Sequence, residues 1–303
     1  MRALLFAGQG VQVVGMGARA AEAVPTARRL FDAASEVLGY NLLSACTHGP
    51  QALLDSTAVC QPAILTSSLA AVELLVHERG EEMRAADVVC GLSLGEYSAL
   101  VYAGALQFED AVEVVRVRGE AMQAASEVVG QASSMVSVVG AGECDVREIC
   151  YQASSSVGDD IVIANFLGPG NFTLSGSLAA CNEVESICSE RDAVRAVRLA
   201  VSGGFHSEFM RPACDALRTA LQAVPLERTQ MSVLSNVDAL PHDSVDDMCM
   251  KLVRQLTAPV LWEASMRAAL DSGVREWTAV GPGTVTAALL KRIHRRAKVA
   301  CIG

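Results

Sequence analysis

A serine in a glycine-flanked turn is the strongest chemical signal in the sequence. Residues 91–95 read Gly-Leu-Ser-Leu-Gly and match the pattern G-x-S-x-G, with Ser93 at the centre. An apolar run precedes the motif and a helical pattern follows it, so we expect the serine on a sharp strand-to-helix turn. The backbone amide of Leu94 would then face a developing oxyanion. Because five-residue matches also arise by chance in loops, the motif needs a partner before it predicts a nucleophile.

A serine hydroxyl is a poor nucleophile at neutral pH and needs a base, which is usually a histidine with a pKa of about 6.5. The chain has five histidines. We expect His48 in a loop, His77 at a helix end, His242 in a turn and His294 in a basic cluster. His206 instead follows Ser-Gly-Gly-Phe at the end of a predicted strand, where loops build active sites. His206 is therefore the candidate base, with a hydrogen-bonded structural histidine as an equal alternative.

The apolar pattern around these residues predicts an α/β fold. Short apolar runs at 3–7 and 87–90 are typical of buried parallel strands, and helical patterns follow them. Strands joined by helices indicate a mainly parallel sheet. The chain returns to this sheet late, through further predicted strands and a final helix. The predicted helices cover 27–38, 62–78 and 109–123, and the predicted return strands cover 230–236 and 275–280.

The middle of the chain has a different pattern, in the order strand, helix, strand, strand, helix, strand. This order is typical of a ferredoxin-like domain. We therefore predict a large hydrolase-like α/β domain formed by residues 1–130 and 201–303, with a small ferredoxin-like domain inserted at residues 131–200. The six predicted elements cover 134–139, 144–153, 161–165, 171–175, 178–191 and 196–201.

The composition is that of a globular protein with a large core, because 51% of the residues are hydrophobic and 19% are charged. The formal net charge of −10 argues against nucleic acid as a partner, since phosphate binding needs a basic stripe. No apolar run reaches the ~18 residues of a membrane span, so no membrane partner is expected. The one basic cluster, at 291–298, is interpreted as a cationic last helical turn, with a docking patch as the alternative.

The ten cysteines carry no sign of metal binding or of a disulfide framework. They are scattered, with no C-x-x-C pair and no histidine at ligand spacing. Cys60, Cys90 and Cys181 lie in or beside apolar runs and are expected to be small buried side chains in a reducing compartment. We predict neither a metal nor a cofactor.

A series of short motifs along the whole chain is similar to those of malonyl-CoA:acyl carrier protein transacylases, in the same order and spacing. The resemblance implies that malonyl-CoA and holo-acyl carrier protein are the substrates, that a malonyl group passes between them on a serine, and that the protein is a monomer. The matching segments are residues 8–10, 91–97, 118–119, 122–123, 204–207, 235–237 and 280–283, together with Gln255, Pro259 and Trp262.

The resemblance also implies the roles of the catalytic residues. Ser93 would carry the malonyl ester, and His206 would act first as base and then as the acid for the departing thiolate. Gln255 would orient His206 through its backbone carbonyl, in place of a triad carboxylate. The backbone amides of Gln9 and Leu94 would form the oxyanion hole.

Three further residues would contact the substrate. The resemblance assigns Arg118 to the malonyl carboxylate, which its two-pronged guanidinium suits well. Pairing of Arg118 with a glutamate on a helix surface is the alternative. Asn165 matches a position that contacts the bound acyl group. Phe205 precedes the histidine, where related acyltransferase domains have Phe when they select malonyl and Ser when they select methylmalonyl.

A few positions depart from the common family pattern. Leu92 stands where most members have His, and residues 163–166 read Ile-Ala-Asn-Phe; both features are similar to cyanobacterial and plastid members. Ala7 replaces a common Pro and Gly204 a common Ala, which affects loop rigidity rather than chemistry. We therefore expect a plastid stroma, reached after removal of a targeting segment, with the bacterial cytoplasm as the alternative.

Two other classes of protein remain open at this point. A serine esterase or thioesterase of the α/β-hydrolase type also uses G-x-S-x-G, but its His-Gly-Gly-Gly oxyanion motif is missing and the Gly-Gln-Gly at 8–10 would go unexplained. A non-enzymatic carrier-protein binding module would have no need to keep Ser93, His206 and Arg118 together. An acyltransferase is thus the favoured interpretation.

Overall fold

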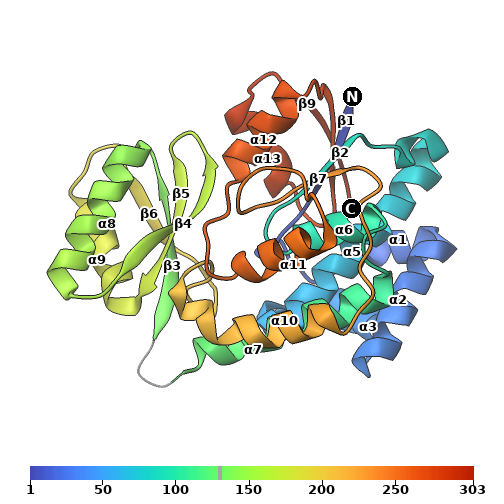
Figure 1. Ribbon diagram of the computed structural model, residues 1–303, viewed down its shortest axis with the longest axis horizontal. Helices are drawn as coiled ribbons and strands as arrows, with labels where there is room; N and C mark the ends of the chain where they lie inside the picture. Colours follow the sequence, from blue (N-terminus) through green and yellow to red (C-terminus); the bar gives the residue numbers. More distant parts are fainter. Residues whose placement is uncertain (129–131) are drawn as a thin grey trace.

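Two separate β-sheets organise the chain, and the larger sheet is parallel throughout (Figure 1). This computed structural model describes residues 1–128 and 132–303. In the large sheet β1 lies at the centre, paired with β2 on one side and with β8 on the other, in the order β7-β2-β1-β8-β9. Its strands are β1 (Arg2–Phe6), β2 (Val88–Gly91), β7 (Ser232–Leu234), β8 (Glu276–Val280) and β9 (Lys298–Ile302).

Helices cover both faces of the large sheet. Leu4 and Phe6 of β1 pack into one hydrophobic cluster and Leu5 into another, as expected when successive side chains of a strand point to opposite faces. The helices and 3₁₀ turns of this part are α1 (Ala18–Ala23), α2 (Pro25–Leu38), α3 (Leu42–His48), α4 (Gln51–Asp55), α5 (Thr57–Arg79), η1 (Glu81–Arg84), α6 (Gly95–Tyr102), α7 (Phe108–Ser126), η2 (Glu208–Ala213), α10 (Cys214–Gln222), α11 (Val245–Arg254), α12 (Trp262–Asp271) and α13 (Val285–Ile293).

Helix α5 runs through the core. It has 23 residues and is long and apolar enough to cross a membrane, with a mean hydropathy of 1.6 over its most apolar window, but 89% of that window is buried inside the protein. Side chains all around the helix, such as Ile64, Leu65 and Leu74, are shielded from solvent, which is typical of a central core helix. The expectation that no stretch of the chain has the length and hydropathy of a membrane span is therefore wrong for α5, which has both but is buried in the core.

The smaller sheet is antiparallel and has the predicted ferredoxin-like arrangement. Its strands lie in the order β4-β5-β3-β6, and every neighbouring pair is antiparallel. Two helices pack on one face, where Val138, Ile149 and Leu174 belong to a separate hydrophobic cluster (Figure 1). The predicted fold class is thus confirmed. The elements are β3 (Ser133–Val139), α8 (Glu143–Val157), β4 (Ile161–Gly168), β5 (Asn171–Ser177), α9 (Leu178–Ser189) and β6 (Arg195–Arg198).

The two sheets are joined by main-chain hydrogen bonds. The amide of Phe166 in β4 donates to the carbonyl of Val260 at 2.9 Å, and the amide of Val260 donates to the carbonyl of Ala164 at 2.8 Å. These bonds tie the small sheet to the segment that leads into α12. The predicted boundary between residues 130 and 131 lies outside the described residues, so the domain limits at 131 and 200 stay predictions.

The C-terminal basic cluster differs from the expectation. Helix α13 ends at Ile293, so only Lys291 and Arg292 lie in a last helical turn. The chain then leaves the helix at His294, and Lys298 begins β9, which pairs with β8 in parallel. The final element is therefore an edge strand and not a helix, because the short apolar run at the C-terminus finds a partner in the sheet.

Candidate active site

Ser93 lies on a tight turn between β2 and α6. Its φ is 50°, a left-handed conformation that is uncommon for a residue with a side chain. The turn is so close that a Cβ on Gly91 would lie 1.9 Å from the carbonyl carbon of Gly95. Position 91 therefore requires glycine. Ser93 is the residue of the turn that adopts the strained left-handed conformation. This is the strand-to-helix turn that the G-x-S-x-G pattern predicts.

Asn236, which follows β7, holds this turn in place. Its Oδ1 accepts a hydrogen bond from the Ser93 amide at 2.6 Å, and its Nδ2 donates to the Gly91 carbonyl at 2.7 Å. Since the Ser93 amide is already engaged, that amide is not available to an oxyanion. Asn236 occurs in one of the matching motifs, but the sequence analysis assigned it no role.

His206 reaches Ser93 from the loop that follows β6. Its Nε2 lies 2.9 Å from the Ser93 Oγ, and its Nδ1 lies 2.8 Å from the backbone carbonyl of Gln255. A carbonyl oxygen only accepts hydrogen bonds, so the ring proton belongs on Nδ1, and Nε2 is left to accept the proton of the serine. The structure thus brings Ser93, His206 and Gln255 together in an order that suits a general base.

The surroundings of His206 keep its ring neutral. Burial lowers the pKa of His206 to about 4, the Arg118 cation acts in the same direction, and the hydrogen bond to the Gln255 carbonyl opposes both. The side chain is buried, so a charged imidazolium would lose its hydration. A neutral imidazole is the form that can take up a proton near pH 7.

Arg118 is fully buried and points at the same serine. Its Nη2 lies 3.3 Å from the Ser93 Oγ and donates to the Gln255 Oε1 at 2.9 Å, while its Nη1 donates to the Gln61 Oε1 at 2.8 Å. Its guanidinium carbon lies 5.3 Å from the centre of the Tyr97 ring. Among the described residues it makes no ion pair, its Nε has no partner, and burial lowers its pKa. A buried cation without an anion is an open binding position for one.

The alternative of a surface ion pair for Arg118 is wrong. Glu113 and Glu120 on the same helix pair with Arg116 instead, at 2.5 Å and 2.8 Å. Arg118 is turned inward because α7 lies against the start of α5, where a Cβ on Gly119 would come within 2.7 Å of the Thr57 carbonyl oxygen. Glycine at 119 therefore lets the two helices approach closely enough to bring Arg118 to Gln61.

The two backbone amides expected to form the oxyanion hole belong to residues that follow neighbouring strands of the large sheet, β1 and β2. Leu94 follows the serine at the start of α6, and Gln9 lies in the loop after β1. Within the described part of the chain, neither backbone amide donates to another protein atom. The Gln9 side chain is held by Thr57, to whose hydroxyl it donates at 3.3 Å. Both amides are therefore free to donate, and their role stays a prediction.

The remaining predicted contacts lie at the junction of the two sheets. Asn165 is in β4, beside Val260, and its side chain makes no hydrogen bond to the described residues around Ser93. Phe205 precedes His206, and its side chain is buried in the main hydrophobic cluster. The carbonyl of Phe205 accepts a hydrogen bond from the Ser175 hydroxyl of β5. The small sheet thus helps to hold the loop that carries His206.

A buried acid–histidine pair behind the turn went unrecognised in the sequence. Glu96, the second residue of α6, lies 2.9 Å from the Nε2 of His242, and both side chains are 1% exposed. The expectation that His242 lies in an ordinary turn missed this contact. The signal that could have found it is an acidic residue directly after the G-x-S-x-G motif, where a helix would carry it inward.

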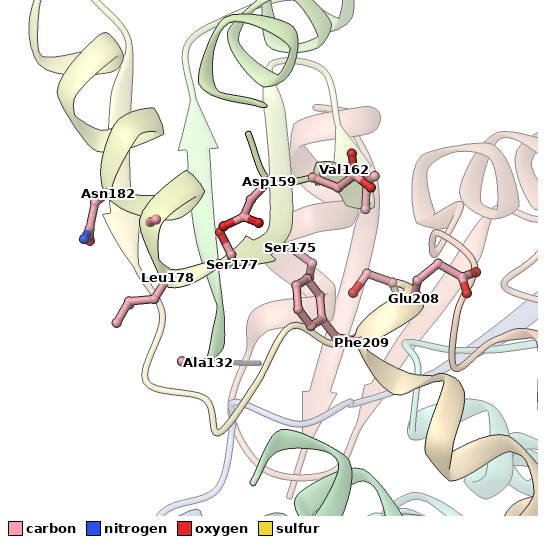
Figure 2. A pocket seen from close by; sticks show the side chains of 12 residues that line it. Ala132, Asp159, Val162, Ser175, Ser177, Leu178, Asn182, Glu208 and Phe209 are labelled. Atoms are coloured by element: carbon pink, nitrogen blue, oxygen red, sulfur yellow. The ribbon is translucent and has the colours of Figure 1, made fainter. Parts of the chain in front are cut away.

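A large cavity lies outside this group of residues. It has a volume of about 800 Å³ and is lined by residues of β5, α9 and η2, including Ser177, Leu178 and Glu208. Figure 2 shows Asp159, Ser175, Ser177 and Phe209 around it. None of the residues that line it is Ser93, His206 or Arg118, so the chemistry and not the cavity size identifies the candidate site. In the described parts of the chain no group of acidic, histidine and cysteine side chains could hold a metal ion.

The site is that of a protein that can hold a charged acyl group on a serine. It combines a parallel α/β fold, a strained serine beside a neutral histidine, and a buried arginine that makes no ion pair with a described residue. In agreement with this, residues 3–300 match the acyl transferase domain family. Because the match covers nearly the whole chain, the protein belongs to that family.

Individual relatives are similar to this chain over nearly the whole of its length. The chain is 40% identical to the mitochondrial malonyl-CoA-acyl carrier protein transacylase of Homo sapiens, covering 97% of this chain and 77% of that protein. It is 38% identical to the malonyl CoA-acyl carrier protein transacylase of Bacillus subtilis, covering 99% and 92%. Among solved structures, a type II PKS acyl-carrier protein in complex with its malonyl-transacylase gives a TM-score of 0.92 at 34% identity, covering 99% of this chain and 95% of that chain.

Proposed function

We propose that the protein transfers a malonyl group from malonyl-CoA to the thiol of holo-acyl carrier protein, through an ester on Ser93, and so supplies units for fatty acid synthesis. The observation that carries the proposal is the position of Arg118. Its guanidinium is buried, makes no direct ion pair with any described residue and lies 3.3 Å from the serine oxygen. A malonyl group, which has three carbons and ends in a carboxylate, can place that carboxylate against the guanidinium while its carbonyl carbon is esterified to Ser93, whereas an acyl group without a carboxylate has no use for the arginine.

The reaction proceeds in two half-reactions, the acylation of Ser93 and the transfer of the acyl group to the carrier protein. The Ser93 oxygen attacks the thioester carbon while its proton moves to the His206 Nε2, and the amides of Gln9 and Leu94 hold the charge on the oxyanion. The carbon–sulfur bond then breaks, and coenzyme A leaves as a thiol with the proton from His206. In the second half the thiol of the carrier protein gives its proton to His206 and attacks the ester carbon, and Ser93 regains the proton as it leaves.

The mass of the intact protein after mixing with malonyl-CoA tests the proposal. A transferase without its carrier protein keeps a malonyl ester, and the adduct disappears when holo-acyl carrier protein is added. A serine esterase or thioesterase would instead release free malonate continuously. A binding module would show neither adduct nor malonate, and either of these results would contradict the proposal.

Arg118→Ala is expected to remove the preference for malonyl over acetyl. The substrate carboxylate would enter a buried pocket without a partner, which costs about 2–5 kcal/mol. Acetyl-CoA has no carboxylate, so its slow reaction should stay the same or rise. The measurement is the ratio of the malonyl to the acetyl kcat/KM in the wild type and in the variant. Arg116→Ala, two residues away and half-buried in ion pairs with Glu113 and Glu120, is the control. If Arg118→Ala leaves the ratio unchanged, Arg118 does not bind the carboxylate.

Phe205 is expected to exclude branched acyl groups. The residue is 5% exposed, so its ring has little room to move aside for an α-methyl group. One methyl in a tight pocket changes selectivity by roughly 1–3 kcal/mol. The wild type should therefore prefer malonyl-CoA to methylmalonyl-CoA by about 10- to 200-fold in kcat/KM, and Phe205→Ser should reduce that preference. Equal values for the two substrates in the wild type would remove Phe205 from the specificity-determining residues.

We also propose a location and an assembly state for the protein. The relatives named above are bacterial or mitochondrial proteins, which agrees with a bacterial cytoplasm or an organelle. A plastid location is supported here only by Leu92 and by the sequence at 163–166. A monomer is proposed on the family resemblance, and the absence of a nucleic-acid partner on the net charge. The absence of a membrane partner is proposed because α5 is buried inside the protein.

A further inference from the structure

Glu96 connects the groups that position the serine and the histidine. Its Oε2 accepts hydrogen bonds from the backbone amide of Asn236 at 3.0 Å and from the Gln255 Nε2 at 2.7 Å. Its Oε1 lies 2.9 Å from the His242 Nε2. Asn236 in turn holds the serine turn, and Gln255 holds His206. A single buried carboxylate, 1% exposed, is thus bonded to both supports of the site.

The side-chain amide of Gln255 links Glu96 to Arg118. The amide donates from Nε2 to Glu96, and its Oε1 accepts from the Arg118 Nη2 at 2.9 Å. A carboxylate accepts and does not donate, so Glu96 requires the NH₂ end of the amide and leaves the oxygen end for the arginine. The buried anion and the buried cation therefore face each other across one amide group, and neither touches the other directly.

His242 does not cancel the charge of Glu96. Its Nδ1 is buried and has no partner among the described residues. A neutral ring with its proton on Nε2 donates to Glu96 and leaves Nδ1 as an acceptor without a hydrogen. A charged ring would instead bury an unpaired N–H donor, which costs more. The assigned form is therefore a neutral His242, which leaves Glu96 as the anion nearest to Arg118 in this network.

We propose that Glu96 is the built-in counter-charge of Arg118, acting through the Gln255 amide, and that it limits how tightly Arg118 holds the malonyl carboxylate. This inference rests on the proposed function. The Glu96 carboxylate also opposes the effect of burial on the pKa of Arg118. Because the anion is held one amide away, the guanidinium keeps donors free for the substrate, which a direct ion pair would occupy.

There is a functional reason to limit how tightly Arg118 binds the malonyl carboxylate. The malonyl group must leave Ser93 on the carrier protein in every turnover. Binding that is equally strong in the ground state and in the transition state does not raise the rate of the chemical steps. A full, uncompensated positive charge would hold the malonyl ester in the site and slow its departure. Glu96 would therefore be a positioning and specificity-determining residue and not a catalytic one.

Glu96→Gln removes the charge and keeps the shape. The new carbonyl can accept from Asn236 and Gln255. The new NH₂ group can donate to His242 only when the ring proton moves to the buried Nδ1, which has no partner among the described residues, so this variant should also lose some stability. We expect free malonate to inhibit the acylation of Ser93 about tenfold more strongly than in the wild type, because one charge at this range in a protein interior changes a binding constant by about that factor. The KM for malonyl-CoA should fall by a similar factor, and the KM for acetyl-CoA should not change.

A purely structural role for Glu96 predicts another pattern. Loosened support of the serine and histidine would lower kcat for both acyl-CoA substrates equally and would leave the inhibition constant of malonate unchanged. Glu96→Ala, which breaks all the bonds at once, is expected to show that loss of kcat. Glu96→Asp keeps the charge, so it should keep the malonate constant of the wild type. Glu120→Gln, an exposed carboxylate two residues from Arg118, is the control for net charge.

The outcomes separate this inference from the proposed function. If the wild type forms no malonyl ester, both fail. If the wild type reacts and Glu96→Gln binds malonate no more tightly than the wild type does, only the counter-charge is overturned. For a variant of low stability, the rise of the unfolding midpoint with malonate concentration gives the same comparison, because a ligand that binds the folded state stabilises it in proportion to its affinity. A steeper rise in Glu96→Gln supports the inference, and an equal one overturns it.

Discussion

Ser93→Ala is expected to abolish both the malonyl adduct and the transfer to the carrier protein. No other nucleophilic side chain is bonded to His206 in the described chain, so no group can replace the serine as the carrier of the ester. Loss of the nucleophile in serine enzymes lowers kcat by about 10⁶-fold. The measurement is the mass of the intact protein after mixing with malonyl-CoA, together with the rate of transfer.

Ser98→Ala provides a matched control for this prediction. Ser98 lies on α6, the helix that follows the Ser93 turn, is fully buried, and has a hydroxyl without a partner among the described residues. Its removal should therefore leave the adduct and the transfer at the level of the wild type. A specific malonyl adduct that survives in Ser93→Ala would assign the nucleophile to another residue and would refute the mechanism.

His206→Ala is expected to slow the acylation of Ser93 by ~10⁴-fold, because only the oxyanion donors and substrate binding would remain. The substrate should still bind, since Arg118 does not depend on the imidazole for its hydrogen bonds. A single-turnover experiment at several malonyl-CoA concentrations separates the rate from the binding constant. His294→Ala, an exposed histidine outside the site, should react normally. A near-normal rate in His206→Ala would transfer the role of base to another group.

The same histidine sets the acid limit of the reaction. The pKa of His206 is about 4 in the folded protein, so the imidazole stays neutral well below pH 6.5, and half of the acylation rate should be lost near pH 4. Folding stability follows the same group. An unfolded histidine takes up a proton near pH 6.5, so between about pH 6.5 and pH 4 the unfolded state binds more protons, and stability falls as the pH falls. A rate profile with its midpoint near pH 6.5 would contradict a buried, neutral His206.

Local patterns predicted the parts of the protein that depend on neighbours in sequence. The Ser93 turn was predicted because glycines, an apolar run and a helix start lie side by side in the chain. The two sheets could be predicted in outline because their strands differ in how they alternate with helices. The C-terminal strand β9 was missed, because a run of five residues shows no period of its own and becomes a strand by pairing with β8.

The supports of the site could not be predicted in this way. Asn236 bonds to a residue 143 positions away, and His242 to one 146 positions away. A polar residue in a loop has the same sequence pattern whether it faces water or a buried carboxylate. The inward direction of Arg118 depends likewise on the close approach of two helices. These contacts are properties of the packed fold, and only the family resemblance pointed to some of them.

The bonds that join Phe166 and Ala164 to Val260 contain main-chain atoms alone. Every amino acid except proline supplies the same amide donor. Substitutions of the side chains at these positions should therefore leave the hydrogen bonds between the two sheets in place. Only a proline at 166 or 260 would remove one of the two donating amides. The distance between the sheet that carries the Ser93 turn and the sheet that carries Asn165 is therefore fixed at this point by backbone atoms, and it does not depend on which side chains surround them.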